Sequence, residues 1–408
     1  MSTAPLRILL VAETALPYVS GVTVAIDALA RGLGALGHEV LLLAPRPPGG
    51  AAAPEAGTGG PAPRTVWLPS AQLPPPAPRG YRIPLPLAGR RPMAEARAFA
   101  PHLVHVHSPF GAGVRGRRLA RRLGVPLVFT HHTRFDDYAH YLGPAARPAA
   151  AALRRTIAAF WDTCDAVIAP GSDLGAEIAS GLPRGAATLV RVIPGGIDVE
   201  AIRSLAPIDP RPAAGWSAGV PVAVALGRLA PEKSVEELLE AAALVPGLHL
   251  AVIGDGPSAA ALRARAARSD LAERAWFAGA LPRPEALAVL RGGDLFVTAS
   301  RTETQGLVVA EALSAGLPVV AVDASGVRDA VRPGIDGLLV PAAPAASRSR
   351  RLADAMAELV HDDARRTAMA AAAADGAVRL GLPGRTGQVI ELYRELVDAA
   401  RRHVSTPC

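Results

Sequence analysis

Short apolar runs alternate with longer amphipathic stretches along this chain of 408 residues. Apolar runs of four to eight residues between turn signals predict buried strands, whereas apolar positions three and four apart predict helices. The chain opens with a run at 7–12, a helical pattern at 22–34 and a second run at 39–44, which predicts a strand, a helix and a strand. Further strands are expected at 65–68, 103–107, 127–130, 166–169 and 189–193.

A second alternating series begins after the Pro-rich stretch at 207–212. Its predicted strands lie at 222–226, 249–253, 276–277, 295–297 and 319–322, and its clearest helices at 234–244 and 258–268. Strands that alternate with helices predict parallel sheets covered on both faces. Ligands of such sheets bind at the carboxyl ends of the strands.

We therefore expect an α/β protein made of two Rossmann-like, doubly wound domains that face a central cleft. The predicted domains are residues 1–200 and 201–387, and an amphipathic final helix, 388–404, is expected to pack back on the first. Residues 45–92 are rich in Pro, Gly and Ala and are expected to form mainly loop.

The composition is that of a folded protein, because 50% of the residues are hydrophobic and 19% are charged. The two cysteines, Cys164 and Cys408, cannot supply a disulfide framework, which favours a reducing compartment. No apolar run reaches the ~18 residues of a membrane span. We expect a cytoplasmic protein that can lie peripherally on the inner face of the cell membrane.

The net charge of +7 is concentrated in the first half of the chain. Residues 1–200 hold 20 Arg and 13 acidic residues, whereas residues 201–408 hold 23 basic and 23 acidic residues. The pattern at 114–123 predicts a basic amphipathic helix, which suits an anionic membrane surface; a solvated Arg-rich face is the alternative. Interleaved aromatics are lacking there, which argues against a nucleic-acid partner. The arginines expected at the membrane are Arg117, Arg118, Arg121 and Arg122, beside Arg115.

Two glycine motifs differ in their context. The segment 32–37, Gly-Leu-Gly-Ala-Leu-Gly, matches the dinucleotide fingerprint by letter, but it ends a helix instead of opening one. We interpret it as a helix C-terminus. Gly254-Asp-Gly256-Pro257 follows a predicted strand and precedes a helix, where its glycines would permit a ligand to approach; a plain tight turn is the alternative.

The segment 227–234, Gly-Arg-Leu-Ala-Pro-Glu-Lys-Ser, follows the first strand of the second series, and Ser234 is a candidate N-cap. Arg228 offers a planar fork for phosphate oxygens, and Lys233 offers a compact charge on a flexible stem. The chain contains 42 Arg and a single Lys. This bias predicts a specific role for Lys233, although a surface lysine left by chance is the alternative.

The strongest motif runs from Ser300 to Glu311 and places two glutamates eight residues apart. A helix that begins near Gly306 would direct its N-terminal amides and its dipole at an anion. Glu311 would then lie inside this helix and Glu303 in the preceding loop. One carboxylate could hold a ribose and the other a sugar, with a diphosphate between them; two ordinary glutamates on a capped helix are the alternative.

These residues resemble the E-x7-E signature of family 4 glycosyltransferases, which have the GT-B fold. The version at 302–307, Thr-Glu-Thr-Gln-Gly-Leu, is similar to that of bacterial diacylglycerol glucosyltransferases and related lipid mannosyltransferases. The resemblance extends to 17–22, a first loop expected to place Gly21 at the donor phosphates, and to 192–198. It implies that Arg228 and Lys233 hold the diphosphate. The other implied donor contacts are Gly254, Thr304, Gln305, Gly306, Leu307 and Glu311.

The tract 130–141 resembles the corresponding tract of the lipid glucosyltransferases. It implies that His132 is the active-site histidine beside the reacting sugar, with Glu303 as the second catalytic residue. Tyr138 and Tyr141 are candidates for the acceptor entrance. His105 and His107 resemble a strand-end signature of the family, and we expect them to be structural.

The resemblance implies a hexosyltransferase that moves a hexose, with glucose favoured, from a nucleotide diphosphate sugar to a lipid such as 1,2-diacylglycerol with retention at the anomeric carbon. No D-x-D motif occurs, so no metal or other cofactor is expected beyond the UDP- or GDP-sugar donor. The alternatives are a GDP-mannose-dependent mannosyltransferase, and transfer to a soluble or polysaccharide acceptor. A Rossmann oxidoreductase and a nucleic-acid module are disfavoured by the misplaced fingerprint and the neutral second half.

Overall fold

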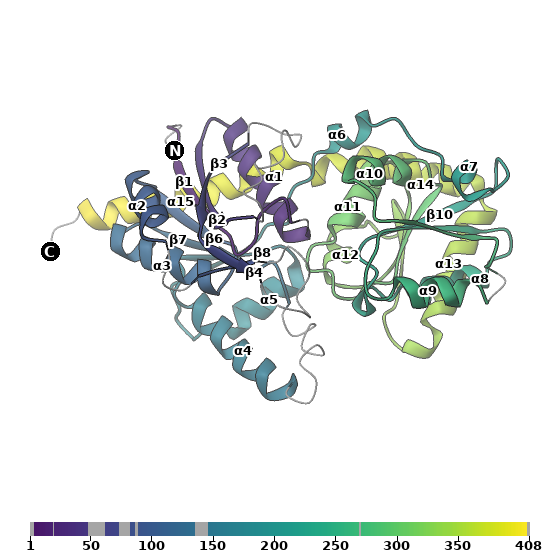
Figure 1. The fold of residues 1–408 in the computed structure, drawn as a ribbon, viewed down its shortest axis with the longest axis horizontal. Coiled ribbons are helices and arrows are strands. Elements are labelled where there is room, and N and C mark those ends of the chain that lie inside the picture. Colours follow the sequence, from purple (N-terminus) through teal and green to yellow (C-terminus); the bar gives the residue numbers. More distant parts are fainter. Residues whose placement is uncertain are drawn as a thin grey trace. The chain divides into compact units, whose positions relative to one another are not determined.

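The computed structural model describes residues 4–18, 20–47, 62–72, 82–85, 89–134, 146–268 and 271–405. The chain divides into two compact units. Unit 1 comprises Met1–Asp198 and Leu382–Cys408, and unit 2 comprises Val199–Gly381. Each unit holds a parallel sheet with helices on both faces (Figure 1), which confirms the predicted doubly wound α/β class.

The sheet of unit 1 has seven parallel strands in the order β3-β2-β1-β6-β7-β8-β9. Its side chains alternate between two cores: Ile8 and Leu10 of the first strand face one core, while Leu9 and Val11 face the other. Both faces are therefore buried, which explains why the strands are nearly continuous apolar runs. The strands are β1 (Arg7–Val11), β2 (Glu39–Pro45), β3 (Arg64–Leu68), β6 (Leu103–Val106), β7 (Leu127–Thr130), β8 (Ala166–Ala169) and β9 (Leu189–Val192). A separate antiparallel pair joins β4 (Ser70–Gln72) to β5 (Arg82–Pro84).

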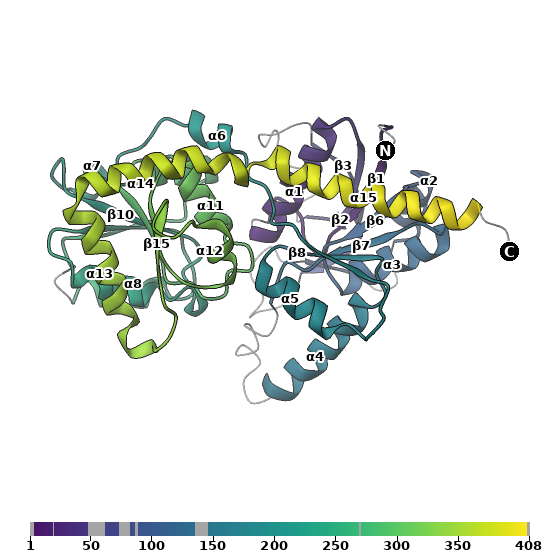
Figure 2. The ribbon, with the colours of Figure 1, turned by 180° about the vertical axis from the view of Figure 1, so that it is seen from behind.

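The helices of unit 1 cover the two faces of this sheet unequally. α1 (Gly21–Ala35) and α15 (Leu382–Ser405) pack on one face, and Figure 2 shows α15 running beside α1. The other face is covered by α2 (Arg90–Ala98), α3 (Gly111–Leu123), α4 (Ala146–Trp161) and α5 (Ser172–Gly181).

The final helix is longer than the sequence pattern indicates, since it begins at Leu382 instead of Gln388. It lies close to α1, because a Cβ built on Gly32 would approach Thr386 Oγ1 to 2.5 Å. Gly32 therefore lies inside α1, and Gly37 follows the C-terminal end of the helix with φ +82°. The fingerprint-like glycines thus close a helix, as expected from their context.

The sheet of unit 2 has six parallel strands in the order β12-β11-β10-β13-β14-β15. They are β10 (Val222–Leu226), β11 (His249–Ile253), β12 (Ala275–Gly279), β13 (Leu295–Thr298), β14 (Val319–Val322) and β15 (Gly337–Val340). One core face is formed with α8 (Val235–Ala243), α9 (Ala259–Ala266) and α13 (Arg348–His361). The remaining helices are α6 (Val199–Ser204), α7 (Pro210–Ala214), α10 (Arg283–Arg291), α11 (Leu307–Ser314), α12 (Ser325–Ala330) and α14 (Asp363–Gly376), with short 3-10 turns at Pro231–Lys233, Ala345–Ser347 and Ala377–Leu380.

Each sheet reverses its strand order at one point. In unit 2 the chain adds β11 and β12 on one side of β10, then returns to add β13 on the other side. In unit 1 the same reversal lies between β1 and β6. Loops that leave adjacent strands at a reversal diverge to opposite faces and open a crevice at the carboxyl ends of the strands. The segments 227–234 and 299–306 follow β10 and β13, so both predicted donor loops lie at the reversal of unit 2.

Tyr393 anchors α15 to the sheet of unit 1. Its side chain is fully buried, and its hydroxyl shares a hydrogen bond with Nδ1 of His105 on β6. His105 Nε2 in turn lies 2.7 Å from Thr130 Oγ1. The final helix therefore meets the sheet through a buried polar contact as well as through apolar packing.

We expect Tyr393→Phe to lower the free energy of unfolding by about 1–3 kcal/mol, because it leaves a buried imidazole nitrogen without its partner. Urea denaturation would measure the change. The control is Thr156→Ala, which removes an exposed hydroxyl from α4 and should stay within about 0.5 kcal/mol of wild type. Equal stability of Tyr393→Phe and wild type would show that the buried hydrogen bond is not a stabilising contact.

Candidate active site

The loop after β10 is fixed by backbone contacts with the turn after β11. Gly227 N donates to Ile253 O, and Leu229 N donates to Asp255 O, each at 3.0 Å. A Cβ on Gly254 would lie 1.9 Å from Gly227 O, and Gly254 has φ +132°. The glycines of this turn therefore admit the chain's own 227–229 backbone. Gly254 therefore permits the close contact between the turn after β11 and the loop after β10. A direct contact between Gly254 and the donor remains a proposal.

Arg228 and Lys233 project from this loop with different degrees of exposure. Half of the Arg228 side chain is exposed (49%), and its nearest acid, Glu232, lies 3.8 Å away with its own side chain only 3% exposed. Ser234 occupies the N-cap position of α8, but its side chain makes no capping hydrogen bond, and its φ of +50° is left-handed. The predicted N-cap position of Ser234 is confirmed, but a capping hydrogen bond from its side chain is not formed. The residue contributes to the turn through its left-handed backbone conformation.

The loop after β13 leads into α11 at the glycine that the sequence indicates. Gly306 is the N-cap of α11 with φ +65°, and a Cβ there would lie 2.7 Å from Gly326 O. Gly326 N donates to Glu303 O at 2.9 Å. Thr304 and Gln305 complete the turn before the first helical residue, Leu307, so these predicted donor residues lie together at the N-terminus of α11.

Both glutamates of the motif are paired with cations. Lys233 Nζ lies 2.5 Å from Glu303 Oε1, with the side chains 26% and 14% exposed. Glu311 lies inside α11 with its side chain 5% exposed and is paired with Arg283 of α10. The prediction that one glutamate lies in the helix and the other in the loop is confirmed. The structure brings Lys233 to Glu303 across 70 residues of sequence.

Arg283 was missed by the sequence reasoning. A signal for it existed, because a cation at the first position of a helix opposes the helix dipole. Arg283 is the first residue of α10, in the segment Leu281-Pro-Arg-Pro-Glu285. A residue type that is unfavourable for the local helix indicates a tertiary partner, but no pattern could identify that partner as Glu311.

In unit 1, four histidines gather at the carboxyl ends of β6 and β7. The rings of His105 and His107 lie 4.1 Å apart between centroids, and those of His107 and His132 lie 5.2 Å apart. His131 packs on Phe129 and Trp161. His105 is fully buried and bonded on both nitrogens, which agrees with the structural role expected for it.

His107 controls the tautomer of His132. Nδ1 of His107 lies 2.9 Å from Nε2 of His132, so one proton lies between them. Nε2 of His107 is buried without a partner among the described residues. Since buried N–H groups without acceptors are rare, we assign the proton of His107 to Nδ1, which donates to His132. His132 then carries its own proton on Nδ1.

These histidines are uncharged at neutral pH. Burial lowers the pKa of His105 and of His132 to about 3, with repulsion from a neighbouring imidazole as the second cause. Burial also lowers the pKa of His131 to about 4, and that of His107 well below its ordinary value. His132 can therefore donate or accept a hydrogen bond, but it carries no positive charge.

The remaining predicted residues of unit 1 are placed as follows. Gly21 is the first residue of α1, next to the N-cap Ser20, whose side chain accepts a hydrogen bond from Thr23 N at 3.2 Å. Tyr138 and Tyr141 lie outside the described residues. A carboxylate that the sequence reasoning did not use, Glu13, follows β1 and accepts a hydrogen bond from Ala112 N at 2.8 Å, which caps α3.

The predicted basic helix is α3, but its apolar face is not available to a membrane. Leu119 and Ala120 pack into the core of unit 1. Arg115 donates to Leu85 O, and the guanidinium of Arg117 lies 5.5 Å from the ring of Phe160. The membrane interpretation of α3 is therefore corrected in one respect, because no apolar stripe remains to insert into lipid. The exposed arginines of this helix are Arg118, Arg121 and Arg122.

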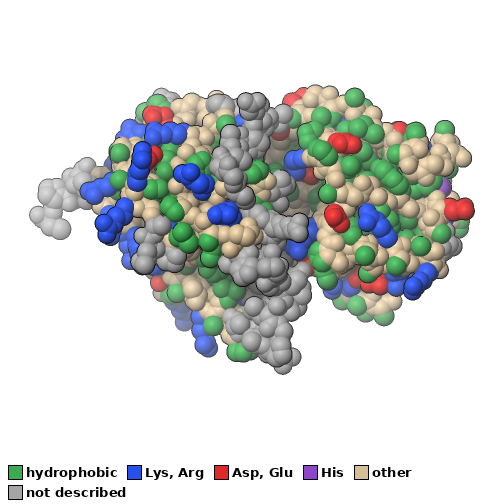
Figure 3. All heavy atoms as spheres, viewed as in Figure 1, with side chains coloured by type: hydrophobic (Ala, Val, Ile, Leu, Met, Phe, Trp, Pro, Cys, Tyr) green, Lys and Arg blue, Asp and Glu red, His purple; other side chains and the backbone are tan. Residues whose placement is uncertain are grey.

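The two units differ in charge. Unit 1 holds 24 Arg against 15 acidic residues, and unit 2 holds 19 basic against 21 acidic residues. Figure 3 shows basic side chains scattered over the visible surface of unit 1. The positive charge of the chain thus belongs to unit 1, which suits attraction to an anionic surface without insertion.

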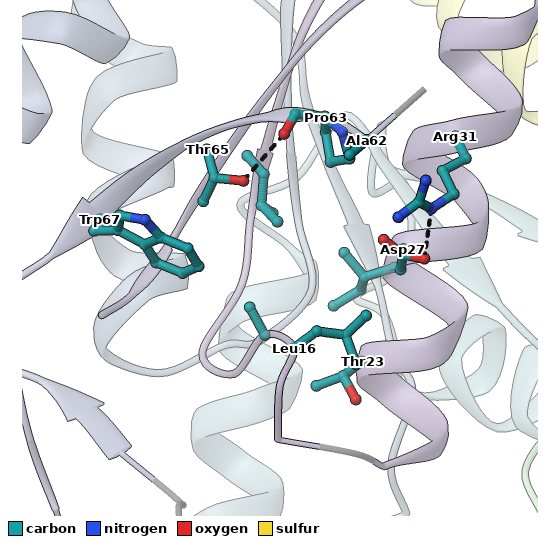
Figure 4. Close-up of a pocket in the computed structure, with 11 residues that line it drawn as sticks. Leu16, Thr23, Asp27, Arg31, Ala62, Pro63, Thr65 and Trp67 are labelled. Carbon is teal, nitrogen blue, oxygen red and sulfur yellow. Dashed lines mark hydrogen bonds and ion pairs between the residues drawn. The ribbon is translucent and has the colours of Figure 1, made fainter. Parts of the chain in front are cut away.

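A recess of about 410 Å³, counting its open mouth, lies in unit 1 between α1 and the start of β3 (Figure 4). Trp67 and Leu16 supply apolar walls. The cation that lines it, Arg31, has a side chain 2% exposed and lies 2.8 Å from Asp27. Because this buried charge is already neutralised, the recess offers little to attract a charged group, and we assign it no ligand.

Within the described ranges, no helix is long and apolar enough to cross a membrane. Over the same part of the chain, no group of three or more His, Cys, Asp or Glu side chains is placed to hold a metal ion.

Two doubly wound units, each with one reversal of strand order, are characteristic of the GT-B fold. Residues 19–201 match the family model of Glycosyltransferase Family 4, and residues 210–375 match that of Glycosyl transferases group 1. The chain therefore belongs to family 4 of the glycosyltransferases and is a hexosyltransferase, as the sequence resemblance implied.

Similar proteins include a mannosyltransferase and a synthase of a glucosylated diacylglycerol. A GDP-mannose-dependent alpha-mannosyltransferase of Mycobacterium tuberculosis (strain CDC 1551 / Oshkosh) is 34% identical over 87% of this chain and 88% of its own length. The alpha-monoglucosyldiacylglycerol synthase of Acholeplasma laidlawii is 28% identical over 77% of this chain and 80% of its own. The structure of sucrose-phosphate synthase from Thermosynechococcus elongatus, 22% identical, aligns with a TM-score of 0.76 over 97% of this chain and 100% of that one, which shows the shared GT-B fold.

The histidine cluster predicts a loss of stability in acid. The folded state holds the pKa of His131 near 4, whereas the unfolded chain protonates near 6.5, so stability is complete above about pH 6.5 and falls as the pH drops toward 4. Melting temperatures between pH 7.5 and 5 would measure this. His131→Phe keeps the aromatic packing but removes one titrating group, so its melting temperature should fall less steeply.

The matched control is His361→Gln, which removes an exposed histidine outside the cluster. An equal acid dependence of His131→Phe and wild type would contradict the assignment of His131 as a buried neutral group.

Proposed function

We propose that this protein transfers mannose from GDP-mannose to a hydroxyl of a lipid acceptor, with retention at the anomeric carbon. The observation that carries the donor half is the pair of cation-bound glutamates at the strand reversal of unit 2, beside Arg228 and the N-terminus of α11. Mannose is preferred to glucose as the transferred sugar because the mannosyltransferase relative shares more identity over more of the chain. Glucosyl transfer to diacylglycerol, favoured from sequence alone, becomes the second candidate.

The donor diphosphate would lie against Arg228, Lys233 and the amides that open α11. Arg228 has an exposed guanidinium, and the dipole of α11 favours an anion at Gly306. These groups would stabilise the charge that develops on the diphosphate as its bond to the sugar breaks, which is the part that a metal ion has in other enzymes. Lys233 must exchange Glu303 for phosphate oxygens, which would release the Glu303 carboxylate to the sugar hydroxyls.

In the proposed reaction the bond from the anomeric carbon to the diphosphate oxygen breaks, and the acceptor oxygen bonds to the same face of that carbon. The departing diphosphate takes the proton of the acceptor hydroxyl. His132, kept neutral by burial and with its proton placed by His107, would hydrogen-bond the transferred sugar, and Gly21 would approach the phosphates. Glu311 would accept hydrogen bonds from the ribose.

The acceptor half of the proposal is supported by the charge of unit 1 and by the lipid-modifying relative from Acholeplasma laidlawii. Arg118, Arg121 and Arg122 are exposed and offer electrostatic attraction to an anionic membrane, worth about 1 kcal/mol for each residue near the surface. Because α3 has no apolar face to insert, membrane association should be reversible by salt.

The proposal is tested with a panel of GDP-mannose, UDP-glucose and other UDP- and GDP-sugars, each incubated with diacylglycerol in neutral or anionic liposomes. We expect a mannolipid from GDP-mannose, more of it on anionic liposomes, and less of this enhancement when the three exposed arginines are changed to glutamate. Mass spectrometry would identify the product. If only UDP-glucose yields a glycolipid, the donor is UDP-glucose and the mannosyl proposal is rejected. If product forms only on a soluble sugar, the lipid acceptor is rejected.

Lys233→Ala should lower kcat/KM for the donor by about 10²–10³-fold, because it removes a group that stabilises charge in the transition state. Lys233→Arg should retain part of the activity, since it keeps the charge but not the compact ammonium. Steady-state kinetics at fixed acceptor would measure both. Arg268→Ala, at an exposed arginine after α9, is the control and should match wild type. Full turnover by a folded Lys233→Ala would exclude the phosphate role of Lys233.

A further inference from the structure

Arg283 is a charged residue of the unit 2 site whose position local helix energetics do not explain. It opens α10, where the helix dipole disfavours a cation, and its guanidinium is bound to Oε1 of Glu311 on α11. The exposures of the two side chains differ, with 44% for Arg283 and 5% for Glu311. The arginine therefore reaches from the surface toward a buried carboxylate.

The Glu311 carboxyl has an unfavourable environment without this contact. Burial raises its pKa, the charge and hydrogen bond of Arg283 act in the opposite direction, and the nearby Glu303 raises the pKa further. Lys233 offsets the charge of Glu303 through their ion pair. Among the described residues, Arg283 thus favours the ionised form of Glu311, and Glu303 opposes it.

The contact leaves half of the carboxylate available. Arg283 binds Oε1, while Oε2 has no hydrogen-bond partner among the described residues. An ionised carboxylate accepts hydrogen bonds and donates none, and each oxygen offers two lone pairs. A ribose presents two adjacent hydroxyl donors, so a carboxylate fixed through one oxygen is suited to receive them with the rest of its capacity.

We infer that Arg283 is a positioning residue that orients the Glu311 carboxylate to accept hydrogen bonds from the donor's ribose. This inference rests on the proposed function, since it assigns the nucleotide end of that site. Arg283 acts through Glu311 and makes no contact with the reacting atoms. It therefore contributes to donor binding, and it contributes little to kcat once the donor is bound.

The test is donor binding by calorimetry with Arg283→Ala. We expect the Kd for GDP-mannose to rise about 10- to 100-fold, in the range for hydrogen bonds to charged groups. The rise should be smaller for the 2′-deoxyribose analogue of the donor, because that ligand already lacks one of the hydroxyls that Glu311 would bind. A merely structural residue would weaken both ligands equally.

Two further variants separate a positioning role from a direct contact. Arg283→Lys keeps a cation beside Glu311 and should restore part of the affinity. Arg283→Ala added to Glu311→Gln should cost little beyond Glu311→Gln alone if the two residues act as one unit. Arg350→Ala, which removes an exposed arginine of α13 paired with Asp354, is the matched control for charge and should bind as wild type does.

The pH dependence of binding gives an independent readout. Without Arg283 the pKa of Glu311 moves higher, so the affinity should decline at a higher pH in Arg283→Ala than in wild type as the solution is acidified. GDP-mannose suits this experiment because both of its phosphates are esterified and neither titrates near neutrality. In Arg283→Lys, the loss of affinity for GDP-mannose on acidification should occur at a lower pH than in Arg283→Ala.

The outcomes distinguish the two proposals. If folded wild-type protein binds no sugar nucleotide of the panel, the proposed function fails before Arg283 is tested. If wild type binds GDP-mannose and Arg283→Ala binds it with the same Kd and pH profile, the inference is overturned and the proposed function stands. Equal weakening of the ribose and deoxyribose donors would also overturn the inference.

Discussion

The candidate site depends on removing two carboxylates from water without leaving either charge uncompensated. Glu303 and Glu311 have 14% and 5% exposed side chains, and each is paired with a cation from another element of unit 2. A buried acid without such a partner would protonate or destabilise the fold. A carboxylate paired through one oxygen can still accept hydrogen bonds, which recognition of hydroxyl-rich ligands requires.

The loops that bring these charges together are held by close backbone contacts. Gly254 lets the turn after β11 approach the loop that bears Arg228 and Lys233, and Gly306 lets the loop after β13 approach α12. A side chain at either glycine would clash with a backbone carbonyl oxygen and would also have to adopt a left-handed or otherwise unfavourable φ. These close backbone contacts therefore fix the loops that carry Lys233 and Glu303.

The sequence predicted well what depends on local pattern. Strands β10, β11 and β14 are buried on both faces, so each is an uninterrupted apolar run whose ends are visible. Partners across the fold were not visible: neither the pairing of Arg283 with Glu311 nor that of His107 with His132 follows from spacing. The apolar face of α3 was misjudged for a related reason, because an amphipathic pattern does not say whether that face meets lipid or a sheet.

The two units differ in the electrostatics of their candidate residues: those of unit 2 are charged and paired, whereas the histidines of unit 1 are neutral. In unit 2, the proposed donor site consists of charged pairs, and Lys233 would pass from Glu303 to a phosphate when the donor binds. In unit 1, His132 stays neutral with its proton placed by His107. A cationic histidine beside a sugar whose anomeric carbon becomes positive would oppose the reaction, whereas a neutral one can hydrogen-bond without that penalty. In the proposed reaction, the burial that keeps His132 neutral would therefore favour the same charge development that the cations at the diphosphate would stabilise.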